Sequence, residues 1–420
     1  MIDMKLFREN PNFFRDASRA KNIEIDVERI LELDRRVRLL KTELEGINAQ
    51  KNDVSKRIPM ATAEERKQLI GSMREVDQRA SVLSSELTPI ETDLENLLFH
   101  IPNPSLADVK IGKDESENEV LREVGEKPVF DFPIKDHLQL GEALGIIDVE
   151  QAAKVSASRF NYLIGDGAGL AYAIVQYAMG RVMQSGFTPV VVPHLVNAHT
   201  MRAMGYLEHG GHDEIYYFPK DNLYLIGTAE QPLGGLHVDQ ILSEKKLPLR
   251  YVSLSNAFRR EAGSYGKDTK GIIRMHEFQK IEMFSYTTPE NSDAEHELLL
   301  SIEEDLVKGL GVPYRVIKQC TGDLGLPAAR KYDIECWMPT QDTYRETHST
   351  STCTDFQSRR LNTRYKTGAG ETMFVHTLNG TAFAIGRIMA VILENFQNAD
   401  GSVTIPEVLR PFMGGKAKIS

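Results

Sequence analysis

The sequence predicts an α+β protein in which a long antiparallel α-helical hairpin precedes a domain built around an antiparallel β-sheet. Two observations support this prediction. Apolar residues recur at alternating steps of three and four between residues 30 and 101, which is the spacing of a coiled-coil seam. Beyond residue 136, β-rich runs often follow one another directly, with helices at their flanks, and this favours an antiparallel sheet over alternating βαβ units. We expect two domains, 1–104 and 105–420.

The composition is that of a globular protein of about two domains. The chain has 420 residues, 41% of them hydrophobic and 26% charged, and 50 Lys+Arg against 60 Asp+Glu give a net charge of −10. A protein with this charge that binds a polyanion must do so through a local basic surface. Three cysteines without a CxxC pair disfavour a disulfide framework and a cysteine-rich zinc site. The charged N-terminus is unlike a signal peptide and no apolar run reaches membrane-span length, so we expect a cytoplasmic protein without membrane contact.

The hairpin is predicted from two apolar seams and the break between them. Pro59 cannot continue a helix interior, and Thr62 with Glu65 forms the pattern of a capping box that starts a second helix. Each arm has about 30 residues, so at a rise of 1.5 Å per residue it extends on the order of 40 Å. Residues 27–100 hold 12 Lys+Arg and 14 Asp+Glu, so the charge leaves open whether the hairpin binds RNA or only dimerises or spaces. The seam residues are Ile30, Leu33, Val37, Leu40, Leu44, Ile47, Lys51, Val54 and Ile58, then Leu69, Met73, Val76, Ala80, Leu83, Leu87, Ile90, Leu94, Leu97 and Ile101.

The second domain begins with a proline-punctuated stretch and continues as mixed structure. Residues 102–135 indicate a linker with short strands. Helices are predicted at 136–144, 168–185, 292–310 and 381–397, and strands at 188–192, 216–218, 223–226, 249–254, 276–286 and 373–377. A GxGxxG after a strand and a GxxxxGK[ST] are both absent from the sequence, which disfavours a dinucleotide fold and a P-loop.

Polar residues of the types that serve in catalysis and ligand binding are concentrated in five segments: 227–230, 257–264, 274–283, 343–349 and 379–387. Arg259 follows an apolar run, and a guanidinium there needs an anionic partner such as phosphate or carboxylate. The next loop carries Gly263, Gly266, Lys267, Lys270 and Gly271, a basic composition suited to covering a nucleotide. On the return strand, Phe278, Lys280 and Glu282 share one face at period two, which aligns an aromatic ring with a carboxylate.

Each of these residues also has an interpretation without function. Arg259 can pair with Glu261 or Glu282, and Phe278 can belong to the core. Glu346 and Ser349 fit a helix cap as readily as a metal site.

The order of these clusters resembles that of bacterial-type seryl-tRNA synthetases, a family of class II aminoacyl-tRNA synthetases, and the resemblance covers essentially the whole chain. Residues 186–193 resemble motif 1, the homodimer element, residues 258–261 resemble motif 2, and Gly386-Arg387 resembles motif 3. The Thr228-Ala229-Glu230 triplet and residues 376–380 are typical of the seryl branch. The resemblance implies a class II catalytic domain, and a hairpin that binds the long variable arm of serine tRNA through backbone and shape.

The resemblance also implies roles for individual residues. Serine's carboxylate attacks the α-phosphate of ATP, and the tRNA 3′-terminal ribose then takes the seryl group, so the protein's work is positioning and charge neutralisation. Arg259 and Arg387 are the expected catalytic residues, with Arg259 bridging the serine carboxylate and the α-phosphate. The residues expected to bind L-serine are Thr228, Ala229, Glu230, Arg259, Glu282 and Thr381. Those expected to bind ATP are Arg259, Arg260, Glu261, Met275, Phe278, Glu346, Thr347, His348, Ser349 and Arg387, with Glu346 and Ser349 holding Mg²⁺.

Three positions depart from the family pattern, and several functions stay in competition. His348 stands where a small hydroxyl residue is usual, Gly227 where Pro is common, and Val192 where a second Pro often stands. A specialised or inhibitor-resistant paralogue with the same chemistry is therefore one alternative. An amino-acid:carrier-protein ligase is disfavoured because such enzymes lack the long hairpin. A dead-site RNA-binding paralogue is disfavoured because it would not need the retained charged residues. A zinc-dependent seryl enzyme is disfavoured because it needs Cys/His ligands that the sequence does not offer. Charging of selenocysteine tRNA is also left open.

Overall fold

The computed structural model describes residues 2–262 and 271–420, so Gly263, Gly266, Lys267 and Lys270 of the expected nucleotide-covering loop lie outside the described residues. These residues form two compact units. One holds residues 2–19 and 23–102, and the other holds residues 20–22 and 103–420. The domain ranges 1–104 and 105–420 stay predictions. In the part of the chain that is described, every helix is too short or too polar to cross a membrane.

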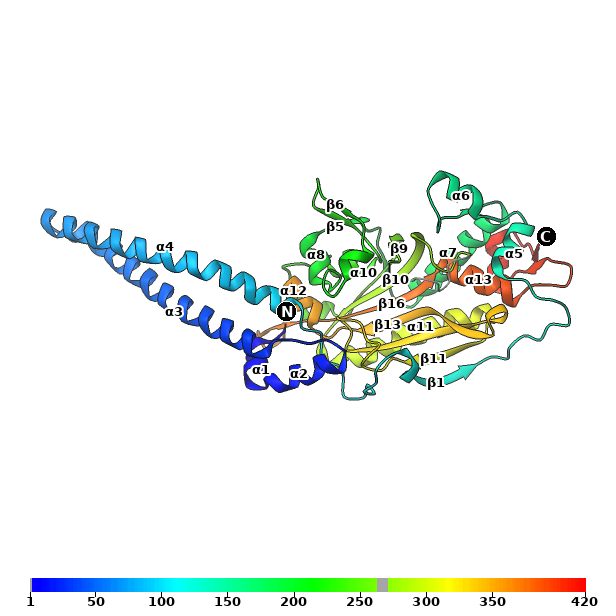
Figure 1. Ribbon diagram of the computed structural model, residues 1–420, viewed down its shortest axis with the longest axis horizontal. Helices are drawn as coiled ribbons and strands as arrows, with labels where there is room; N and C mark the ends of the chain where they lie inside the picture. The colour runs from blue at the N-terminus through cyan, green and yellow to red at the C-terminus, as the bar shows by residue number, and fades with distance from the viewer. Residues whose placement is uncertain (1, 263–270) are drawn as a thin grey trace. The chain divides into compact units, whose positions relative to one another are not determined.

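The elements are as follows (Figure 1). The α-helices are α1 (Met4–Glu9), α2 (Pro11–Ala20), α3 (Val27–Arg57), α4 (Ala63–Phe99), α5 (His137–Ala143), α6 (Val149–Val155), α7 (Asp166–Gln184), α8 (Ala198–Ala203), α9 (Gly211–Glu214), α10 (Glu230–Gly234), α11 (Ser292–Leu310), α12 (Phe356–Leu361) and α13 (Ile385–Asn395). The strands are β1 (Glu119–Val124), β2 (Ile147–Asp148), β3 (Tyr162–Leu163), β4 (Thr188–Pro189), β5 (Leu195–Asn197), β6 (Tyr217–Phe218), β7 (Leu223–Leu225), β8 (Ile241–Ser243), β9 (Leu249–Phe258), β10 (Glu277–Thr287), β11 (Tyr314–Lys318), β12 (Arg330–Met338), β13 (Thr343–Thr352), β14 (Arg364–Lys366), β15 (Thr372–Phe374), β16 (His376–Ala384), β17 (Val403–Thr404) and β18 (Lys418–Ile419).

The first unit contains the predicted antiparallel hairpin. Helices α3 and α4 run side by side in Figure 1, and a single 3-10 turn at Ile58–Met60 separates them. The predicted capping box is confirmed, because the Thr62 hydroxyl accepts from the Glu65 backbone N–H while the Glu65 carboxylate accepts from the Thr62 N–H. The seam is fully buried only in the half away from the turn. Its buried members there are Ile30, Leu33, Val37, Leu40, Ile47, Ala80, Leu83, Leu87, Ile90, Leu94 and Ile101, and Leu98 is buried more deeply than the expected Leu97.

The second unit is built on an eight-stranded sheet with strand order β1-β11-β12-β13-β16-β10-β9-β4. All its pairs are antiparallel except β4 with β9, so the α+β prediction with an antiparallel sheet is confirmed. Helices α7, α11 and α13 bury their apolar residues against one face of this sheet in a large core cluster. Burying one face of a sheet under helices leaves the opposite face available for a site.

Strand β10 shows how the two faces differ. Ile281 and Met283 join the core under the helices, whereas Phe284 and Tyr286 join a second apolar cluster with residues of α8, α10 and β7. Lys280 and Glu282 lie on the same side as Phe284, because successive strand side chains point to opposite faces. The polar end of β10 therefore meets the cavity described below.

Several predicted elements need correction. The last long helix was expected at 381–397, but residues up to Ala384 belong to strand β16 and the helix is Ile385–Asn395. The strand at 373–377 is in fact the end of β15 and the start of β16. Thr343–Thr352 is a continuous strand, so the helix-cap interpretation of Glu346 and Ser349 is wrong. Residues 188–192 form only the two-residue strand β4.

Candidate active site

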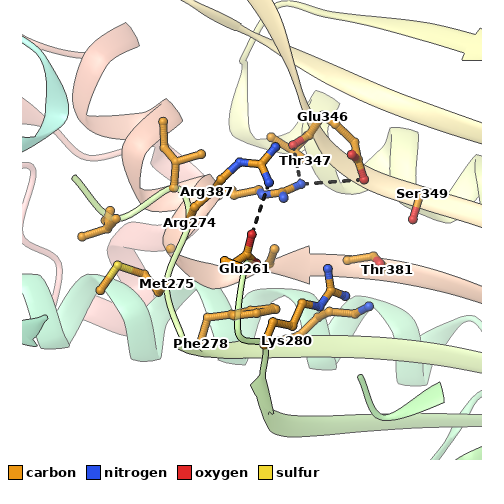
Figure 2. A pocket seen from close by; sticks show the side chains of 15 residues that line it. Glu261, Arg274, Met275, Phe278, Lys280, Glu346, Thr347, Ser349, Thr381 and Arg387 are labelled. Atoms are coloured by element: carbon orange, nitrogen blue, oxygen red, sulfur yellow. Dashed lines mark hydrogen bonds and ion pairs between the residues drawn. The ribbon is translucent and has the colours of Figure 1, made fainter. Parts of the chain in front are cut away.

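A cavity of about 230 Å³ lies among β9, β10, β13, β16 and α13 (Figure 2). Figure 2 shows Phe278 and Lys280 rising from β10 on one side, with Glu346 and Arg387 across from them. Four cationic side chains and two carboxylates contribute to its wall, so the wall carries a surplus of positive charge. Its lining residues are Arg259, Glu261, Ile272, Ile273, Arg274, Met275, Phe278, Lys280, Glu346, Thr347, Ser349, Thr381, Ala384, Gly386 and Arg387.

Arg259 stands directly after the last residue of β9, and its backbone N–H donates to His276 O across the strand pair at 2.9 Å. Its Nε donates to Gly227 O at 3.2 Å, and its guanidinium carbon lies 5.4 Å from the centre of the Phe278 ring. Within the described residues, no carboxylate forms an ion pair with this guanidinium. The alternative in which Arg259 pairs with Glu261 or Glu282 is therefore not what the structure shows. A guanidinium that lines a cavity and pairs with no described carboxylate is suited to an anionic ligand.

Five of the six residues expected to bind serine form or adjoin a buried polar cluster next to Arg259. The Thr228 hydroxyl donates to Glu282 Oε2 at 3.2 Å, and Lys280 Nζ lies 2.6 Å from the same oxygen. Thr381, from β16, lines the cavity itself, and β16 pairs it with Glu282 of β10. Ala229 is fully buried in the second apolar cluster and does not line the cavity.

Glu230 lies deeper in this cluster. Its carboxylate accepts from the Tyr206 hydroxyl at 2.5 Å and from Gln357 Nε2 at 2.8 Å. Burial raises the pKa of Glu230, and the nearby Glu282 carboxylate raises it further, while the two donors and Lys280 oppose the rise. A cationic group brought between Glu230 and Glu282 would relieve this repulsion.

Glu346 and Ser349 reach the same cavity because β13 is irregular between them. Residues three apart on a regular strand face opposite sides of the sheet. The register of β12 with β13 slips at this point, with Ile334 opposite His348 and Glu335 opposite Glu346, so Thr347 is an extra residue. Such a bulge returns Glu346 and Ser349 to one face, and both line the cavity.

Cations surround the Glu346 carboxylate. Burial by itself would raise the pKa of this carboxylate. Four nearby cations instead lower the pKa below its ordinary value, and these are Lys331, Arg387, Arg259 and Lys280. Arg387 Nη1 lies 3.7 Å from Glu346 Oε1 and also donates to Glu346 O at 2.9 Å. The side chain is still 45% exposed, because it faces the open cavity. An ionised carboxylate beside a hydroxyl is an oxygen set that fits Mg²⁺.

The described residues hold no group of three or more His, Cys, Asp or Glu side chains arranged for a metal. Mg²⁺ is usually held by one or two carboxylates together with substrate phosphates.

Two residues expected to bind ATP do not line this cavity. Arg260 turns away, with its Nε donating to Ile215 O at 3.0 Å and its guanidinium over the Tyr216 ring. His348 is buried behind the strand, where Nδ1 lies 2.7 Å from Thr347 Oγ1 and the ring packs on Phe383. Burial lowers the pKa of His348 to about 3, with Arg387 adding to the fall against an opposing effect of Glu346, so the ring is neutral at ordinary pH.

Two charged lining residues were not among the expected ligands. Arg274 Nη1 lies 3.2 Å from Glu261 Oε2, which ties the segment leading into β10 to the residue after Arg260. Lys280 lines the cavity and pairs with Glu282. The period-two spacing of Phe278, Lys280 and Glu282 signalled Lys280, whereas no local pattern signalled Arg274.

Comparison with known proteins gives full-length matches. A family model described as the seryl-tRNA synthetase N-terminal domain matches residues 1–105, and one described as the tRNA synthetase class II core domain (G, H, P, S and T) matches residues 216–396. The serine–tRNA ligase of Thermobifida fusca is 46% identical over 416 residues, which are 99% of this chain and 98% of that protein. The serine–tRNA ligase of Fervidobacterium nodosum is 43% identical over 99% of this chain and 98% of that protein.

Two solved structures are similar along the whole chain. The seryl-tRNA synthetase of Pyrococcus horikoshii complexed with ATP matches with a TM-score of 0.90 and 38% identity, covering 100% of this chain and 99% of that one. The cytoplasmic serine–tRNA ligase of Naegleria fowleri in complex with AMP matches with a TM-score of 0.86 and 32% identity, covering 100% and 99%.

Proposed function

The chain belongs to the seryl-tRNA synthetase family, and we propose that the cavity among β10, β13, β16 and α13 is where it joins serine to ATP. The enzyme is a ligase that activates serine with ATP and charges tRNA with the product. The assignment of the site rests on Arg259. This cation faces the cavity and pairs with no carboxylate of the described residues.

Arg259 neutralises both reacting anions. The serine carboxylate attacks the α-phosphorus of ATP, a new O–P bond forms, and pyrophosphate leaves with the electron pair of the broken bond. Two anions must approach each other in this step, and a guanidinium can donate to both at once. The stack of Arg259 on Phe278 and the bond from Nε to Gly227 O hold the guanidinium in place before substrate arrives.

The cluster of Thr228, Glu230, Glu282 and Thr381 receives the serine amino and hydroxyl groups. The Glu282 carboxylate raises the pKa of Glu230 through repulsion, so an ammonium placed between the two is stabilised by both carboxylates. A site that hydrogen-bonds a substrate hydroxyl rejects the analogue without it, because its own polar groups would be left unpaired.

The remaining cavity residues bind the nucleotide. Phe278 offers a ring face for the adenine base, with Met275 beside it, and Glu261, which Arg274 holds in place, accepts from the base edge. Arg387 contacts the terminal phosphates. Glu346 and Ser349 would hold Mg²⁺, which when bound supplies charge neutralisation for the phosphates. Thr347 also lines the cavity, whereas Arg260 and His348 lie outside it.

The hairpin of α3 and α4 is the element that contacts tRNA. The match of residues 1–105 to the seryl N-terminal domain supports this role, and the exposed cations near the turn, including Lys56, Arg66 and Lys67, supply contacts to the tRNA backbone. The match of this domain also disfavours a carrier-protein ligase, which lacks the hairpin. We further place the reaction in the cytoplasm, where the three buried free thiols stay reduced.

Pyrophosphate exchange with a panel of amino acids tests the proposal. Purified protein should exchange pyrophosphate into ATP with serine, and alanine should support exchange on the order of 10⁴-fold less efficiently in kcat/KM. Charging of serine tRNA, followed on the same preparation, should require both ATP and serine. Exchange with another amino acid at equal or higher kcat/KM would refute the proposed specificity.

A further inference from the structure

A buried histidine outside the cavity connects two of the cavity's walls. His137 is the first residue of α5, and its imidazole is enclosed between α13 and residues 271–272. Of its side chain 6% is exposed, and of the Glu394 side chain next to it none. Neither residue belongs to the reacting groups described above, so their close pairing needs another explanation.

Glu394 holds one edge of the ring. Its Oε1 accepts from His137 Nδ1 at 2.8 Å and from the His137 backbone N–H at 3.2 Å. Its Oε2 accepts from the Thr340 hydroxyl at 2.6 Å and the Thr340 backbone N–H at 3.2 Å. Four donors thus fix this carboxylate, which in turn fixes the plane of the imidazole.

The opposite ring nitrogen accepts a backbone hydrogen bond. The Ile272 N–H donates to His137 Nε2 at 3.3 Å. Because a carboxylate has no proton to give, Nδ1 must carry the ring proton, and Nε2 is left as the acceptor that Ile272 needs. The two contacts together specify one neutral tautomer.

The residue before Ile272 shows how closely the ring approaches this backbone. Gly271 has a φ of +82°, and a Cβ built there would lie 2.0 Å from His137 Nε2. Any other residue would be strained in this conformation and would collide with the ring. Glycine at 271 is therefore required for the contact.

Ile272 connects this contact to the nucleotide. Ile272, Ile273, Arg274 and Met275 all line the cavity. The Ile272 carbonyl also packs on Gly386, where a Cβ would lie 2.9 Å from it, and Gly386 precedes Arg387 in the first turn of α13. The position of the Ile272 backbone thus sets the spacing between the Met275 wall and the Arg387 wall.

We propose that His137 is a positioning residue for ATP, which acts by holding the Ile272 backbone so that residues 272–275 and Arg387 keep the spacing that the nucleotide requires. Serine binds on the far side of Arg259, among residues that make no contact with His137. Loss of the contact should therefore weaken ATP binding selectively. This inference rests on the assignment of the cavity to ATP.

Two substitutions separate the two halves of the contact. In His137→Asn the amide nitrogen can replace Nδ1 toward Glu394, but nothing reaches Ile272. In His137→Gln the longer side chain can place its amide oxygen near the position of Nε2 and accept from Ile272. His296→Gln is the matched control, because His296 is also fully buried but binds Thr350 O and Arg330 instead.

Steady-state pyrophosphate exchange gives the deciding values. For His137→Asn we expect the KM for ATP to rise about tenfold, the size expected when one buried N–H loses its acceptor, with the KM for serine and kcat within about twofold of wild type. His137→Gln should recover most of the ATP affinity. His296→Gln should leave the ratio of the two KM values unchanged, even if its melting temperature falls.

Hydrogen exchange provides a second measurement that does not depend on turnover. The Ile272 amide of the wild-type protein should be protected from exchange without ATP, and His137→Asn should lose that protection. The inference is overturned by a freely exchanging Ile272 amide, by an unchanged KM for ATP in His137→Asn, or by a parallel rise of both KM values. Lack of serine-dependent exchange by wild type would instead refute the proposed function and this inference with it.

Discussion

The cationic side chains of the cavity differ in whether they form an ion pair with a carboxylate. Arg274 pairs with Glu261 and Arg387 with Glu346, while Lys280 pairs with Glu282. Arg259 is the cavity cation that no carboxylate of the described chain neutralises. A desolvated, unpaired charge is costly unless a ligand compensates it, so the arrangement favours binding of an anion at Arg259 over the other cations.

His348 predicts a measurable pH dependence of stability. The folded pKa of about 3 lies below the reference value of 6.5, so between these pH values the unfolded chain binds the proton and the folded chain does not. The contribution of the neutral ring to stability is therefore complete above about pH 6.5 and is lost as the pH falls toward 3. From pH 7 to pH 5 we expect wild type to lose about 2 kcal/mol more of its free energy of unfolding than His348→Thr loses.

Urea titrations at both pH values measure this difference. His296, whose pKa burial lowers to about 4, has the same sign of effect but is present in both proteins, so it cancels. Parallel losses in wild type and His348→Thr would show that the ring is already protonated in the folded state.

The sequence predicts which residue types form the site better than it predicts the contacts between them. Phe278, Lys280 and Glu282 follow from strand alternation, and β10 places them as expected. Their neighbours Arg274 and Tyr206 could not be found in this way, because their partners Glu261 and Glu230 lie 13 and 24 residues away in sequence. The side of the sheet to which His348 points could not be predicted either, because a one-residue bulge decides which side each residue of β13 faces.

Among the elements, those with a clear period were predicted best. Helix α11 agrees with its predicted range because its apolar stripe runs unbroken to Gly311, which ends it with a φ of 75°. Residues 381–384 of strand β16 were mistaken for the start of a helix because β10 and β13 cover this strand on both edges and nearly all its residues are buried, so alternation is absent. The seam of α4 was predicted correctly across Pro89, where buried Leu87 and Ile90 carry the helix through a residue that normally ends one.

The hairpin supports a prediction at the scale of elements. Between Ile47 and Ala80 no seam residue is fully buried, so residues 48–76 can be replaced by a short glycine-rich turn at little cost to the buried seam. We expect this variant to retain the serine-dependent exchange rate of wild type but to charge tRNA at least about tenfold less efficiently in kcat/KM for tRNA, because phosphate contacts are lost.

Equal charging by the shortened and full-length proteins would reduce the distal hairpin to a structural spacer. A fall in exchange would show that the hairpin supports the catalytic unit rather than tRNA binding. Comparing charging at two salt concentrations adds a check, since the full-length protein should lose efficiency with salt more steeply.

The whole molecule is expected to be a homodimer. Val191 follows β4, the edge strand of the large sheet, and is 97% exposed in the single chain. An exposed apolar side chain beside an open strand edge favours association. Sedimentation velocity at micromolar concentration should give twice the chain mass of 47.2 kDa for wild type and the chain mass for Val191→Glu.

Val129→Glu is the matched control, since Val129 is also 97% exposed but lies in the segment between β1 and α5. It should sediment as wild type does. A dimer that persists in Val191→Glu would place the interface elsewhere, and a monomeric wild type would refute the dimer.

For the whole molecule we propose one arrangement, in which the eight-stranded sheet presents Arg259 between the residues that bind serine and the cavity that binds the nucleotide. A crystal structure with a non-hydrolysable seryl-adenylate analogue tests it most directly. We predict that the Arg259 guanidinium will donate hydrogen bonds both to the seryl carbonyl oxygen and to the group that replaces the α-phosphate. An Arg259 side chain that turns to solvent and contacts neither group would contradict the account.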